Sequence, residues 1–392
     1  MSSLFAQFAT PGRGGTAHLL HSEAHVQAPR SRSSPHVPMS RTHSLNPITR
    51  SEAPLVVEFP FAELSAATPN AKFFIRNHFP VPDIDTSTWR LRVEGAVHDS
   101  FSISLDELRS MPAATVSAVI ECSGNSRAFM QGSPRSIQWE LGGVGCATWT
   151  GVPLRDVLAR AGVDANAVDV VFEGADHGPR DKLPGATEIH FARTVPVAVA
   201  AWPNVVLAYE MNGEPLDSAH GAPLRVVVPG WYGVTSVKWL SRVVVMTRPF
   251  TGFFQSVEYT YWDVCGGPSP ERVSVATLQV KSEIARPTVG EEIVAGVEYR
   301  VFGAAWTSEA SIVSVDVSTD DGRTWTAATL GDTADEHAWQ LWELGWTPRE
   351  PGEHVLMARA TDSGGRVQPV AHDLNHENYM VHHVLPIPVV VV

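Results

Sequence analysis

The stretch IECSGNSRAF, Ile120 to Phe129, puts one of only three cysteines between an apolar run and a set of small, turn-forming residues. A structural cysteine in a core is normally surrounded by Val, Leu and Ala, whereas the residues after Cys122 let other atoms come close to its sulfur. Arg127 follows nearby, and a neighbouring cation favours the thiolate, which is the form that binds a soft metal. The stretch therefore indicates a metal ligand or a nucleophile, with a buried structural thiol as the alternative.

Short strands and short helices alternate on both sides of this stretch. SLDELRSMP opens with Ser104 and has Glu107 three residues later, a capping box that predicts a helix. GVPLRDVLARAGV predicts a second helix that begins at Pro153, ends at Gly162 and has one apolar face. TVSAVIE, DVVFEG and LRVVVPG are typical of strands that end in turns. We therefore predict a mixed α+β domain over residues 51–265.

The residue pattern changes around CGGPSPE, residues 265–271, a Gly- and Pro-rich segment that we interpret as a linker. Beyond it SIVSVDVSTDDGRTW alternates, with Val313, Val315 and Val317 predicted on one face and a turn at Asp321-Gly322. Four tryptophans could fill a core between two sheets, namely Trp325, Trp339, Trp342 and Trp346. We predict an immunoglobulin-like β-sandwich over residues 266–392, without the disulfide of that fold.

The composition is that of a soluble globular protein, with 392 residues, 44% hydrophobic and 18% charged. The three cysteines show no CxxC spacing, which excludes a disulfide framework and a zinc ribbon and favours a reducing compartment. Cys146 and Cys265 lack polar or cationic neighbours and are assigned structural roles. The richest apolar segment, residues 195–207, is interrupted by Pro203 and Asn204, so we expect no membrane span.

Residues 1–50 are rich in Ser, Pro, His and Gly, and we interpret them as a disordered basic tail. They contain five arginines and one glutamate, a net charge of +4, so the formal −13 of the chain becomes −17 for residues 51–392. Such an acidic body argues against a nucleic-acid partner. The tail has neither the apolar core of a signal peptide nor paired arginines before one, and we expect a cytoplasmic location.

Two polar stretches stand out where packing alone would not require them. FFIRNHFPVP places Arg76, Asn77 and His78 where they could bind an anionic cofactor, the alternative being a loop with a satisfied arginine. AHGAPLRVVVPGWYGVTSVKW carries three basic side chains beside glycines that permit close approach, a combination that suits a phosphate: His220, Arg225 and Lys238 beside Gly221, Gly230 and Gly233.

Other signatures are weaker or absent. The sequence has no GxxxxGK[ST] phosphate loop, no HExxH and no GxSxG, and LGGVGCA only approaches a dinucleotide fingerprint. Four histidines near the C-terminus suggest a metal, but no second group of ligands accompanies them, and we interpret them as part of a polar strand or an interface: His372, His376, His382 and His383.

Taken in order, several segments resemble the sulfite oxidase family of molybdenum enzymes, of the heme-free bacterial type, over about residues 55–392. They are FFIRNHFPVPDIDTSTWRLRVEG, ECSGNSR, QWELGGVGCATWTGVPLRDVL, VLAYEMNGEPL, HGAPLRVVVPGWYGVTSVKWL and VDVSTDDGRTW. The resemblance implies a mixed α+β domain that binds molybdenum through a pyranopterin dithiolene, followed by an immunoglobulin-like domain that forms a homodimer. Both domains agree with the elements predicted above.

The resemblance also implies roles for individual residues. Cys122 would be the protein thiolate on molybdenum. The cofactor contacts would be Phe74, Arg76, Asn77, His78, Asp176, His220, Arg225, Ser236, Val237 and Lys238. Arg76, Arg127 and Tyr259 would form an anion pocket, in which two arginines hold the substrate and a tyrosine hydroxyl orients it. EYTYWD departs from the family sequence here, so Tyr261 competes with Tyr259.

The implied reaction is oxidation of sulfite to sulfate by oxygen-atom transfer, with the chemistry supplied by the cofactor. No heme is expected, because the first fifty residues are too short for a heme domain and no CxxCH occurs, so a separate acceptor would take the electrons. CSGNSR keeps only the later of two arginines found in animal and plant relatives. Two alternatives stay open: a reductase or dehydrogenase of the same fold acting on nitrate, a sulfoxide or a sulfur adduct, and a scaffold without catalysis.

Overall fold

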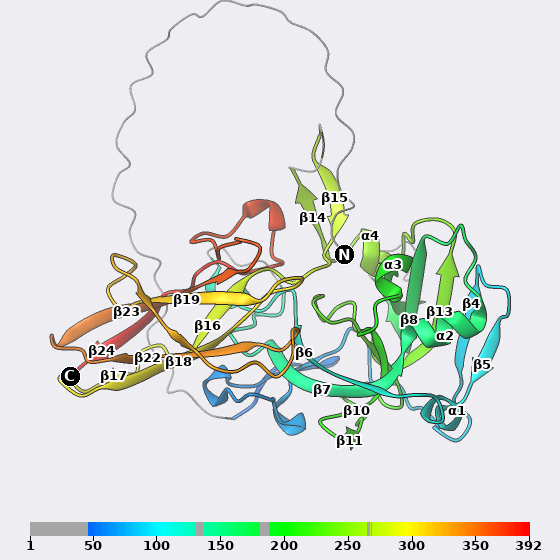
Figure 1. Cartoon of the computed structure of the whole chain (residues 1–392), viewed down its shortest axis with the longest axis horizontal. Coiled ribbons are helices and arrows are strands. Elements are labelled where there is room, and N and C mark those ends of the chain that lie inside the picture. Colours follow the sequence, from blue (N-terminus) through cyan, green and yellow to red (C-terminus); the bar gives the residue numbers. More distant parts are fainter. Residues whose placement is uncertain (1–45, 131–135, 181–187, 265–266, 268) are drawn as a thin grey trace, which may run out of the picture. The chain divides into compact units, whose positions relative to one another are not determined.

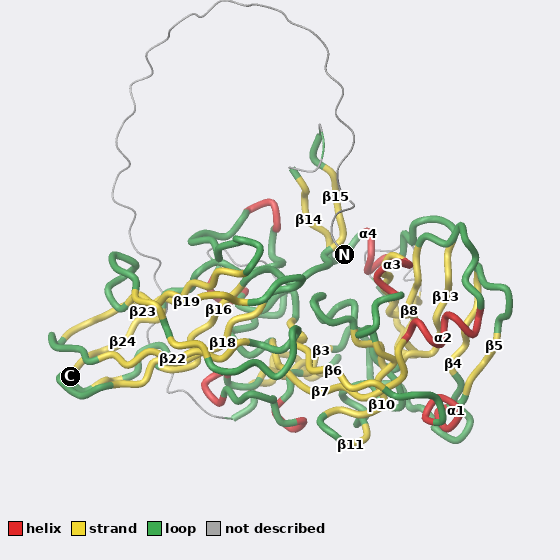
Figure 2. The backbone as a smooth tube through the Cα atoms, viewed as in Figure 1, coloured by secondary structure: helices red, strands yellow, loops and turns green. Residues whose placement is uncertain are grey.

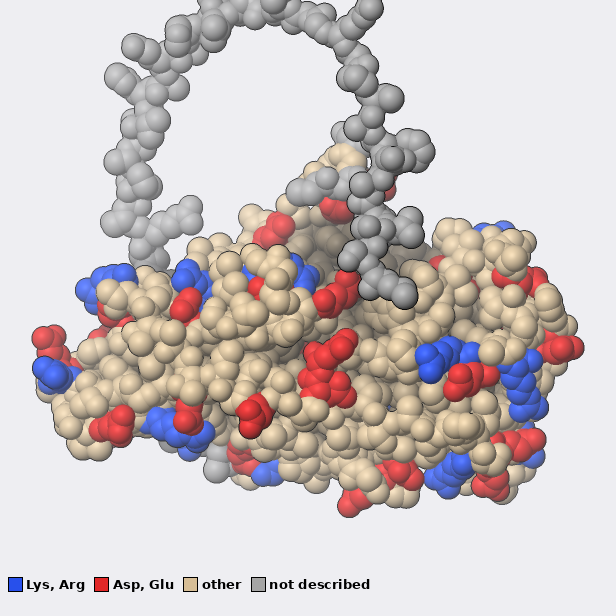
Figure 3. Space-filling view, in the orientation of Figure 1, with Lys and Arg blue, Asp and Glu red and all other residues tan. Residues whose placement is uncertain are grey.

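The computed structural model describes residues 46–130, 136–180, 188–264, 267 and 269–392, and it is built mostly of strands with few, short helices (Figures 1 and 2). The predictions made for residues 1–45 and for Cys265 lie outside the described residues. None of the helices in the described part of the chain has the length and apolar character needed to cross a membrane. On the face drawn in Figure 3, acidic and basic side chains are interspersed.

The part of the chain from β1 to β13, called the first region below, contains three sheets. A small antiparallel sheet is formed by β1 (Ile48–Glu52), β2 (Leu55–Glu58) and β3 (Ile75–Arg76). A second sheet contains β11 (Glu214–Pro215), β10 (Val206–Met211), β7 (Val144–Pro153) and β6 (Ala114–Glu121) in that order, with β12 (Arg225–Val227) paired to β10. The third has the order β5 (Phe101–Ile103), β4 (Leu91–Gly95), β13 (Leu240–Met246), β8 (Asp169–Pro179) and β9 (Glu188–Pro196). Only β4 and β13 pair in parallel in these sheets.

Both helices predicted from the sequence are present. In α1 (Leu105–Arg109) the Ser104 hydroxyl accepts from the Glu107 amide and the Glu107 carboxylate accepts from the Ser104 amide, so the capping box is confirmed. α2 (Leu154–Ala161) follows Pro153 and ends at Gly162, whose φ of 68° is left-handed. The described residues also contain the helices α3 (Val197–Ala200) and α4 (Phe253–Ser256) and single 3-10 turns at Phe61–Glu63, Asn70–Lys72, Arg127–Phe129 and Leu374–His376.

The segment interpreted as a linker falls in the sequence between two paired strands, and its residues 265, 266 and 268 lie outside the described residues. β14 (Thr260–Asp263) and β15 (Glu271–Ser274) pair antiparallel, with Asp263 opposite Glu271. The strands before and after the predicted boundary are therefore hydrogen-bonded to each other. The boundary at 265/266 stays a prediction.

The part of the chain from β16 to β24, called the second region below, is a β-sandwich, as predicted. One sheet has the order β16 (Lys281–Arg286), β18 (Tyr299–Trp306), β22 (Gln340–Trp346) and β21 (Thr329–Leu330). The other has the order β17 (Glu292–Ile293), β24 (Ile387–Val391), β23 (Gly352–Asp362), β19 (Ile312–Ser318) and β20 (Thr326–Ala327). A shared apolar core joins the two sheets through residues such as Val301, Val315 and Leu356.

Two details of the predicted sandwich were wrong. A β-bulge in β19 between Ile312 and Ser314 breaks the alternation, so Val313 is exposed while Val315 and Val317 are buried. Of the four tryptophans only Trp342 belongs to the buried sandwich core. Trp339 instead packs edge-on against Phe61 of the first region, because its indole N–H donates to a carbonyl there. Trp346 packs at the margin of the core, and Trp325 is half-buried against Arg359. The turn at Asp321-Gly322 is confirmed, since both residues have positive φ.

Candidate active site

A cavity opens in the first region beside the ends of β3 and β6, with about 690 Å³ of space including its mouth. That volume is typical of a site for a small molecule or cofactor. The residues that the family resemblance assigns to the cofactor and the anion pocket all line it except Arg127. The lining residues are Phe73, Phe74, Arg76, Asn77, His78, Ile120, Cys122, Ser123, Asp176, Phe191, His220, Arg225, Gly233, Val234, Ser236, Val237, Lys238, Trp239 and Tyr259.

The segment after β3 supplies one wall of the cavity. Phe74 is buried against the ring of Phe73 at 5.4 Å, which fixes the backbone just before Arg76. The Arg76 guanidinium donates to the Asn77 carbonyl, and the Asn77 side-chain oxygen accepts from Lys238. His78 is hydrogen-bonded through Nε2 to the Tyr259 hydroxyl. Burial and the charge of Arg76 hold the pKa of His78 well below its usual range, so its imidazole is neutral.

A second part of the cavity lining carries three basic side chains. His220 Nδ1 lies 2.9 Å from the Asp217 carboxylate. Arg225 donates to the carbonyls of His220 (3.0 Å) and Ser236 (2.9 Å), and burial lowers its pKa to about 9. Lys238 donates to the Ala219 carbonyl at 2.8 Å, and burial followed by the charge of Arg225 lowers its pKa well below the usual value. This wall brings buried positive charges together, which favours an anionic group in the cavity.

Gly221 has a different role from the one predicted. Its φ is 109°, and an added Cβ would lie 2.9 Å from Cβ of Lys238. The glycine therefore makes room for the Lys238 side chain rather than for a ligand. Gly233 does line the cavity, where an added Cβ would meet Ile120 at 2.6 Å.

Several polar atoms around the cavity are buried and have no hydrogen-bond partner among the described residues. They are Asn77 Nδ2, Ser123 Oγ, Asp176 Oδ1 and Arg225 Nε. Burial raises the pKa of Asp176 to about 7, an effect that Lys238 opposes. Buried polar groups are nearly always hydrogen-bonded in folded proteins, so four such atoms on one cavity indicate a polar ligand that supplies the missing partners. A pterin ring with a phosphate fits this mixture of donors, acceptors and cations.

Cys122 lies at the point where β6 ends, with its backbone N–H donating to the Gly143 carbonyl at 2.8 Å. Cys122 is 9% exposed and lines the cavity. The described residues hold no group of three or more His, Cys, Asp and Glu side chains arranged to bind a metal. A metal at Cys122 would therefore need further ligands from a cofactor, which a dithiolene provides.

Arg127 is buried behind the cysteine loop and is not a lining residue of the cavity. Its Nε donates to the Asn378 carbonyl (2.9 Å), and its Nη1 donates to the Ile137 carbonyl (2.8 Å) and the Ser136 hydroxyl (3.2 Å). Burial lowers its pKa, while the Cys122 thiol and the Tyr259 hydroxyl oppose that effect. Arg127 thus acts on the site through its charge, and direct contact with a substrate stays a prediction.

The structure distinguishes the two candidate tyrosines. Tyr259 is buried, lines the cavity and has a left-handed φ of 54°. Tyr261 is half-buried and its ring contacts His376 at 5.1 Å instead. The sequence could not separate them, because nothing in it signals the left-handed backbone conformation of Tyr259.

Comparison with known proteins agrees with this geometry. Residues 78–254 match the model of the oxidoreductase molybdopterin binding domain, and residues 272–385 match that of the Mo-co oxidoreductase dimerisation domain. Sulfite oxidase of Arabidopsis thaliana is 30% identical over 339 residues, which cover 78% of this chain and 83% of that protein. The chain belongs to the sulfite oxidase family.

Two further relatives are similar to this chain over most of its length. Human mitochondrial sulfite oxidase is 38% identical over 324 residues, which span 77% of this chain but only 57% of the human protein. The crystal structure of the sulfane dehydrogenase SoxCD from Paracoccus pantotrophus superimposes with a TM-score of 0.74 at 27% identity, covering 86% of this chain and 84% of that one. Both regions of the chain therefore have the architecture of sulfite oxidase family proteins, a molybdenum-cofactor domain followed by an immunoglobulin-like β domain.

Some residues at this family site were not found from the sequence. Ser123 contributes a buried hydroxyl to the cavity, and Tyr379 of the second region packs on Tyr259 at 5.2 Å and under Arg127. Ser123 is adjacent to Cys122 and could have been proposed, but Tyr379 lies 120 residues from Tyr259 and carries no local signal.

The C-terminal histidines form turns and not the polar strand that was one interpretation. Three pairs of these rings are in contact: His372 lies 6.1 Å from His376 and 5.8 Å from His383, and His376 lies 5.8 Å from His382. This segment contacts the cysteine loop, because the Met380 N–H donates to the Ser123 carbonyl at 2.7 Å. The alternative interpretation, an interface, describes its position between the two regions.

Proposed function

We propose that this protein is a molybdenum-dependent enzyme that oxidises sulfite to sulfate and passes two electrons to a separate acceptor. One observation carries the proposal: among the described residues one thiol, that of Cys122, faces the same cavity as Arg76, the Tyr259–His78 pair and a group of buried cations. A thiolate binds a soft metal, and the cationic surroundings suit both an anionic cofactor and a small oxyanion. The family relationship supports the same reaction.

Each wall has a distinct role in this proposal. Asn77, Asp176, Arg225 and Lys238 would hold the pterin and its phosphate, and Cys122 would hold the metal through Sγ. When bound, this group supplies the oxygen atom that the substrate gains and accepts the two electrons that the substrate loses. The protein binds the cofactor, neutralises the substrate and excludes water.

The substrate side is formed by Arg76, His78 and Tyr259. Sulfite is a dianion, so the Arg76 guanidinium would neutralise part of its charge and fix its orientation. A neutral His78 with a proton on Nε2 donates to the Tyr259 oxygen, and the tyrosine O–H then remains for the anion. The positive charge of Arg127 reaches the same space from behind the loop.

A dehydrogenase acting on a sulfur adduct is the second candidate. It is favoured by the position of Arg127, whose Nε and Nη1 already donate to protein oxygens and which is not a lining residue. Of the two described arginines that line the cavity, Arg225 is assigned to the cofactor, so Arg76 alone would face a dianion and would hold it less tightly than two arginines would. The relative SoxCD carries the name sulfane dehydrogenase.

The experiment that tests the proposal measures molybdenum and pterin in the purified chain and then adds sulfite with an artificial one-electron acceptor. We expect stoichiometric molybdenum and sulfite-dependent reduction. Cys122→Ser should abolish turnover while the pterin stays bound. Cys146→Ala is the matched control and should leave turnover unchanged, because that thiol is buried, burial raises its pKa to about 11, and it does not line the cavity.

The outcomes separate the candidates. Molybdenum without reduction by sulfite, but with reduction by a sulfur adduct, would transfer the proposal to the second candidate. A chain without molybdenum from a host that makes the cofactor would contradict both candidates and favour a scaffold without catalysis. Full activity in Cys122→Ser would contradict the assignment of Cys122 as the metal ligand.

We also propose that the protein forms a homodimer through its second region, which the match to a dimerisation domain supports. Light scattering on the purified protein should give twice the chain mass of 42.5 kDa. The cytoplasmic location and the lack of heme stay predictions from the sequence.

A further inference from the structure

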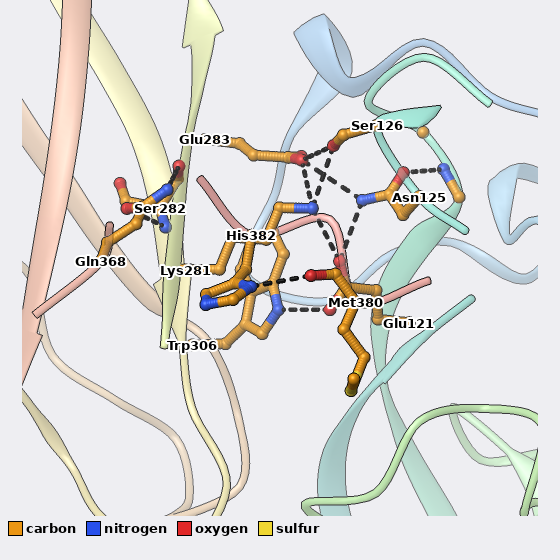
Figure 4. Close-up of polar contacts among 12 residues, drawn as sticks. Glu121, Asn125, Ser126, Lys281, Ser282, Glu283, Trp306, Gln368, Met380 and His382 are labelled. Atoms are coloured by element: carbon orange, nitrogen blue, oxygen red, sulfur yellow. Dashed lines mark hydrogen bonds and ion pairs between the residues drawn. The ribbon is translucent and has the colours of Figure 1, made fainter. Parts of the chain in front are cut away.

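A buried polar network joins the cysteine loop to the second region, outside the cavity. Lys281 and Glu283 lie on β16 of the sandwich, and Glu121, Asn125 and Ser126 lie at the end of β6 and in the loop after Cys122 (Figure 4). All five side chains are buried, and Lys281 is 0% exposed. Two carboxylates and an ammonium are thus withdrawn from water immediately beside the residue that would bind the metal.

The contacts of Lys281 are complete. Its Nζ donates to Glu121 Oε1 at 2.8 Å and to Ser126 Oγ at 3.0 Å, and lies 2.8 Å from Glu283 Oε1. An ammonium has three protons, and each of them has a partner here. The Glu121 carboxylate also accepts from the Trp306 indole of β18 at 2.9 Å, so two strands of the sandwich hold the residue that precedes Cys122.

Glu283 holds the other side of the loop. Its Oε1 accepts from the Ser126 hydroxyl at 2.5 Å and from Asn125 Nδ2 at 3.3 Å. Asn125 in turn accepts from the Gly143 N–H at 3.0 Å, and the Gly143 carbonyl accepts from the Cys122 N–H at 2.8 Å. The chain of hydrogen bonds therefore runs from β16 to the backbone of the cysteine.

The loop needs such support. Ser126 has a left-handed φ of 71°, which a residue with a side chain adopts only where its surroundings impose it. A buried ionic network is no more stable than an apolar cluster of similar volume, so stability alone does not explain why this junction is polar. Directional hydrogen bonds to both ends of the loop do explain it, because they specify one loop conformation.

We propose that Lys281 and Glu283 are positioning residues through which the sandwich region sets the placement of the Cys122 sulfur relative to the metal. The inference rests on the proposed role of Cys122 as the thiolate ligand. Neither residue touches the cavity, so both act through Glu121, Asn125 and Ser126. The second region thereby contributes to the active site of its own chain in addition to its proposed role in dimerisation.

The test compares Glu283→Ala with Glu283→Gln in the molybdenum-loaded, full-length enzyme. Three quantities are measured: the thiolate-to-metal charge-transfer absorption, kcat and KM with sulfite, and the melting temperature. We expect Glu283→Ala to keep its molybdenum, to shift the charge-transfer band and to lower kcat by about tenfold, in the range seen for groups that orient metal ligands. Glu283→Gln should restore most of both, because its amide oxygen still accepts from Ser126 and Lys281.

Two further variants separate positioning from stability. Gln368→Leu is the matched control. Gln368 is buried, and its side-chain oxygen accepts at 2.9 Å from the N–H of Ser282, which lies between Lys281 and Glu283 on β16. Its other hydrogen bonds also stay within the sandwich. It should lower the melting temperature and leave the band and kcat at wild-type values. Ser126→Gly removes the loop's own hydroxyl while it relieves the left-handed φ, and it should shift the band as Glu283→Ala does.

A Glu283→Ala enzyme with the wild-type band and wild-type kcat would overturn the inference, as would equal band shifts in Gln368→Leu. If Glu283→Ala fails to fold, Ser126→Gly decides by the same two measurements. A failure of the proposed function gives a different result: an unsubstituted protein without molybdenum or its charge-transfer band. An altered band in Glu283→Ala supports the inference even if sulfite is the wrong substrate, because the band arises from the sulfur ligands of the metal and needs no substrate.

Discussion

The cavity and the network beside it contain the same kinds of side chain in opposite conditions. In the cavity, four buried polar atoms from Asn77, Ser123, Asp176 and Arg225 have no partner among the described residues. In the network, Lys281 has a partner for every proton, and only Glu283 Oε2 has none within the described part of the chain. Unpartnered buried groups mark a place for a ligand, whereas partnered ones hold geometry.

The comparison also explains how the protein accommodates the buried basic side chains of the cavity. Burial lowers the pKa of Lys238 well below its usual value, with Arg225 adding to the effect, whereas Glu121 and Glu283 outweigh burial and raise the pKa of Lys281. The first lysine is poorly stabilised until an anion binds, and the second is stabilised by the protein itself. A cofactor phosphate would therefore supply to Lys238 what the two glutamates supply to Lys281.

The same substitution at the two lysines should have opposite effects on the cofactor-free protein. Lys281→Met leaves two buried carboxylates without their cation and should lower the free energy of unfolding by about 3–5 kcal/mol. Lys238→Met removes a poorly compensated buried charge and should raise it, while affinity for the cofactor falls by about 10–100-fold through loss of a charge-assisted contact of about 1.5–3 kcal/mol. Urea unfolding of the cofactor-free chain and molybdenum content of the loaded one measure the two effects.

Lys72→Met is the control for this pair, because Lys72 pairs with Glu63 at the surface and its side chain is half exposed. It should change neither quantity. Equal losses of stability in Lys238→Met and Lys281→Met would refute the distinction between the cavity and the network.

The sequence predicted the cavity better than the network, for a physical reason. Arg76, Asn77 and His78 are consecutive, and Cys122 stands beside turn residues, so each leaves a local pattern of polarity where packing does not need it. Lys281 and Glu283 lie two residues apart on a strand, with Ser282 between them, and resemble an ordinary solvent-facing pair. Their meaning depends on Glu121, 160 residues away, which only the packing of the two regions brings into contact.

The fold shows the same limit. The helix caps at Ser104 and Gly162 and the turn at Asp321-Gly322 are set by neighbouring residues and were predicted correctly. The exposure of Val313 and the orientation of Trp339 depend on a bulge and on contacts with another region, and both were predicted wrongly. Local chemistry is visible in a sequence, whereas the partner of a buried side chain is not.

The two arginines assigned to the substrate differ in the same way. Arg76 lines the cavity, whereas Arg127 donates to protein oxygens behind it. Arg76→Met should raise KM for sulfite by about tenfold or more, because it removes a charge-assisted contact of about 1.5–3 kcal/mol. Arg127→Met should raise KM less and should lower the melting temperature, since three protein oxygens lose their donors.

Steady-state kinetics and thermal unfolding of both variants give the answer, with Arg242→Met as a control at a partly exposed arginine that pairs with Glu94 and Glu173. A larger KM effect for Arg127→Met than for Arg76→Met would show that Arg127 binds the substrate directly. The distinction between cavity and supporting residues would then have to be redrawn around that side chain.

The smallest effect is expected from Asp176, the one carboxyl on the cavity whose oxygen has no partner among the described residues. Burial raises its pKa to about 7 in the cofactor-free fold, from about 4 in an unfolded chain. The folded state then binds more protons than the unfolded state between these values, so stability is highest below about pH 4 with respect to this group and falls as pH rises toward about 7. Between about pH 6 and about pH 8 the free energy of unfolding should fall by about 1.4 kcal/mol, which is the equivalent of one pKa unit. Urea unfolding of cofactor-free wild-type protein and Asp176→Asn at both pH values should show this slope in the wild type and not in the variant. Parallel slopes would mean that Asp176 finds a partner in the absence of cofactor, and the cavity would lose one of the four groups that distinguish it from the network.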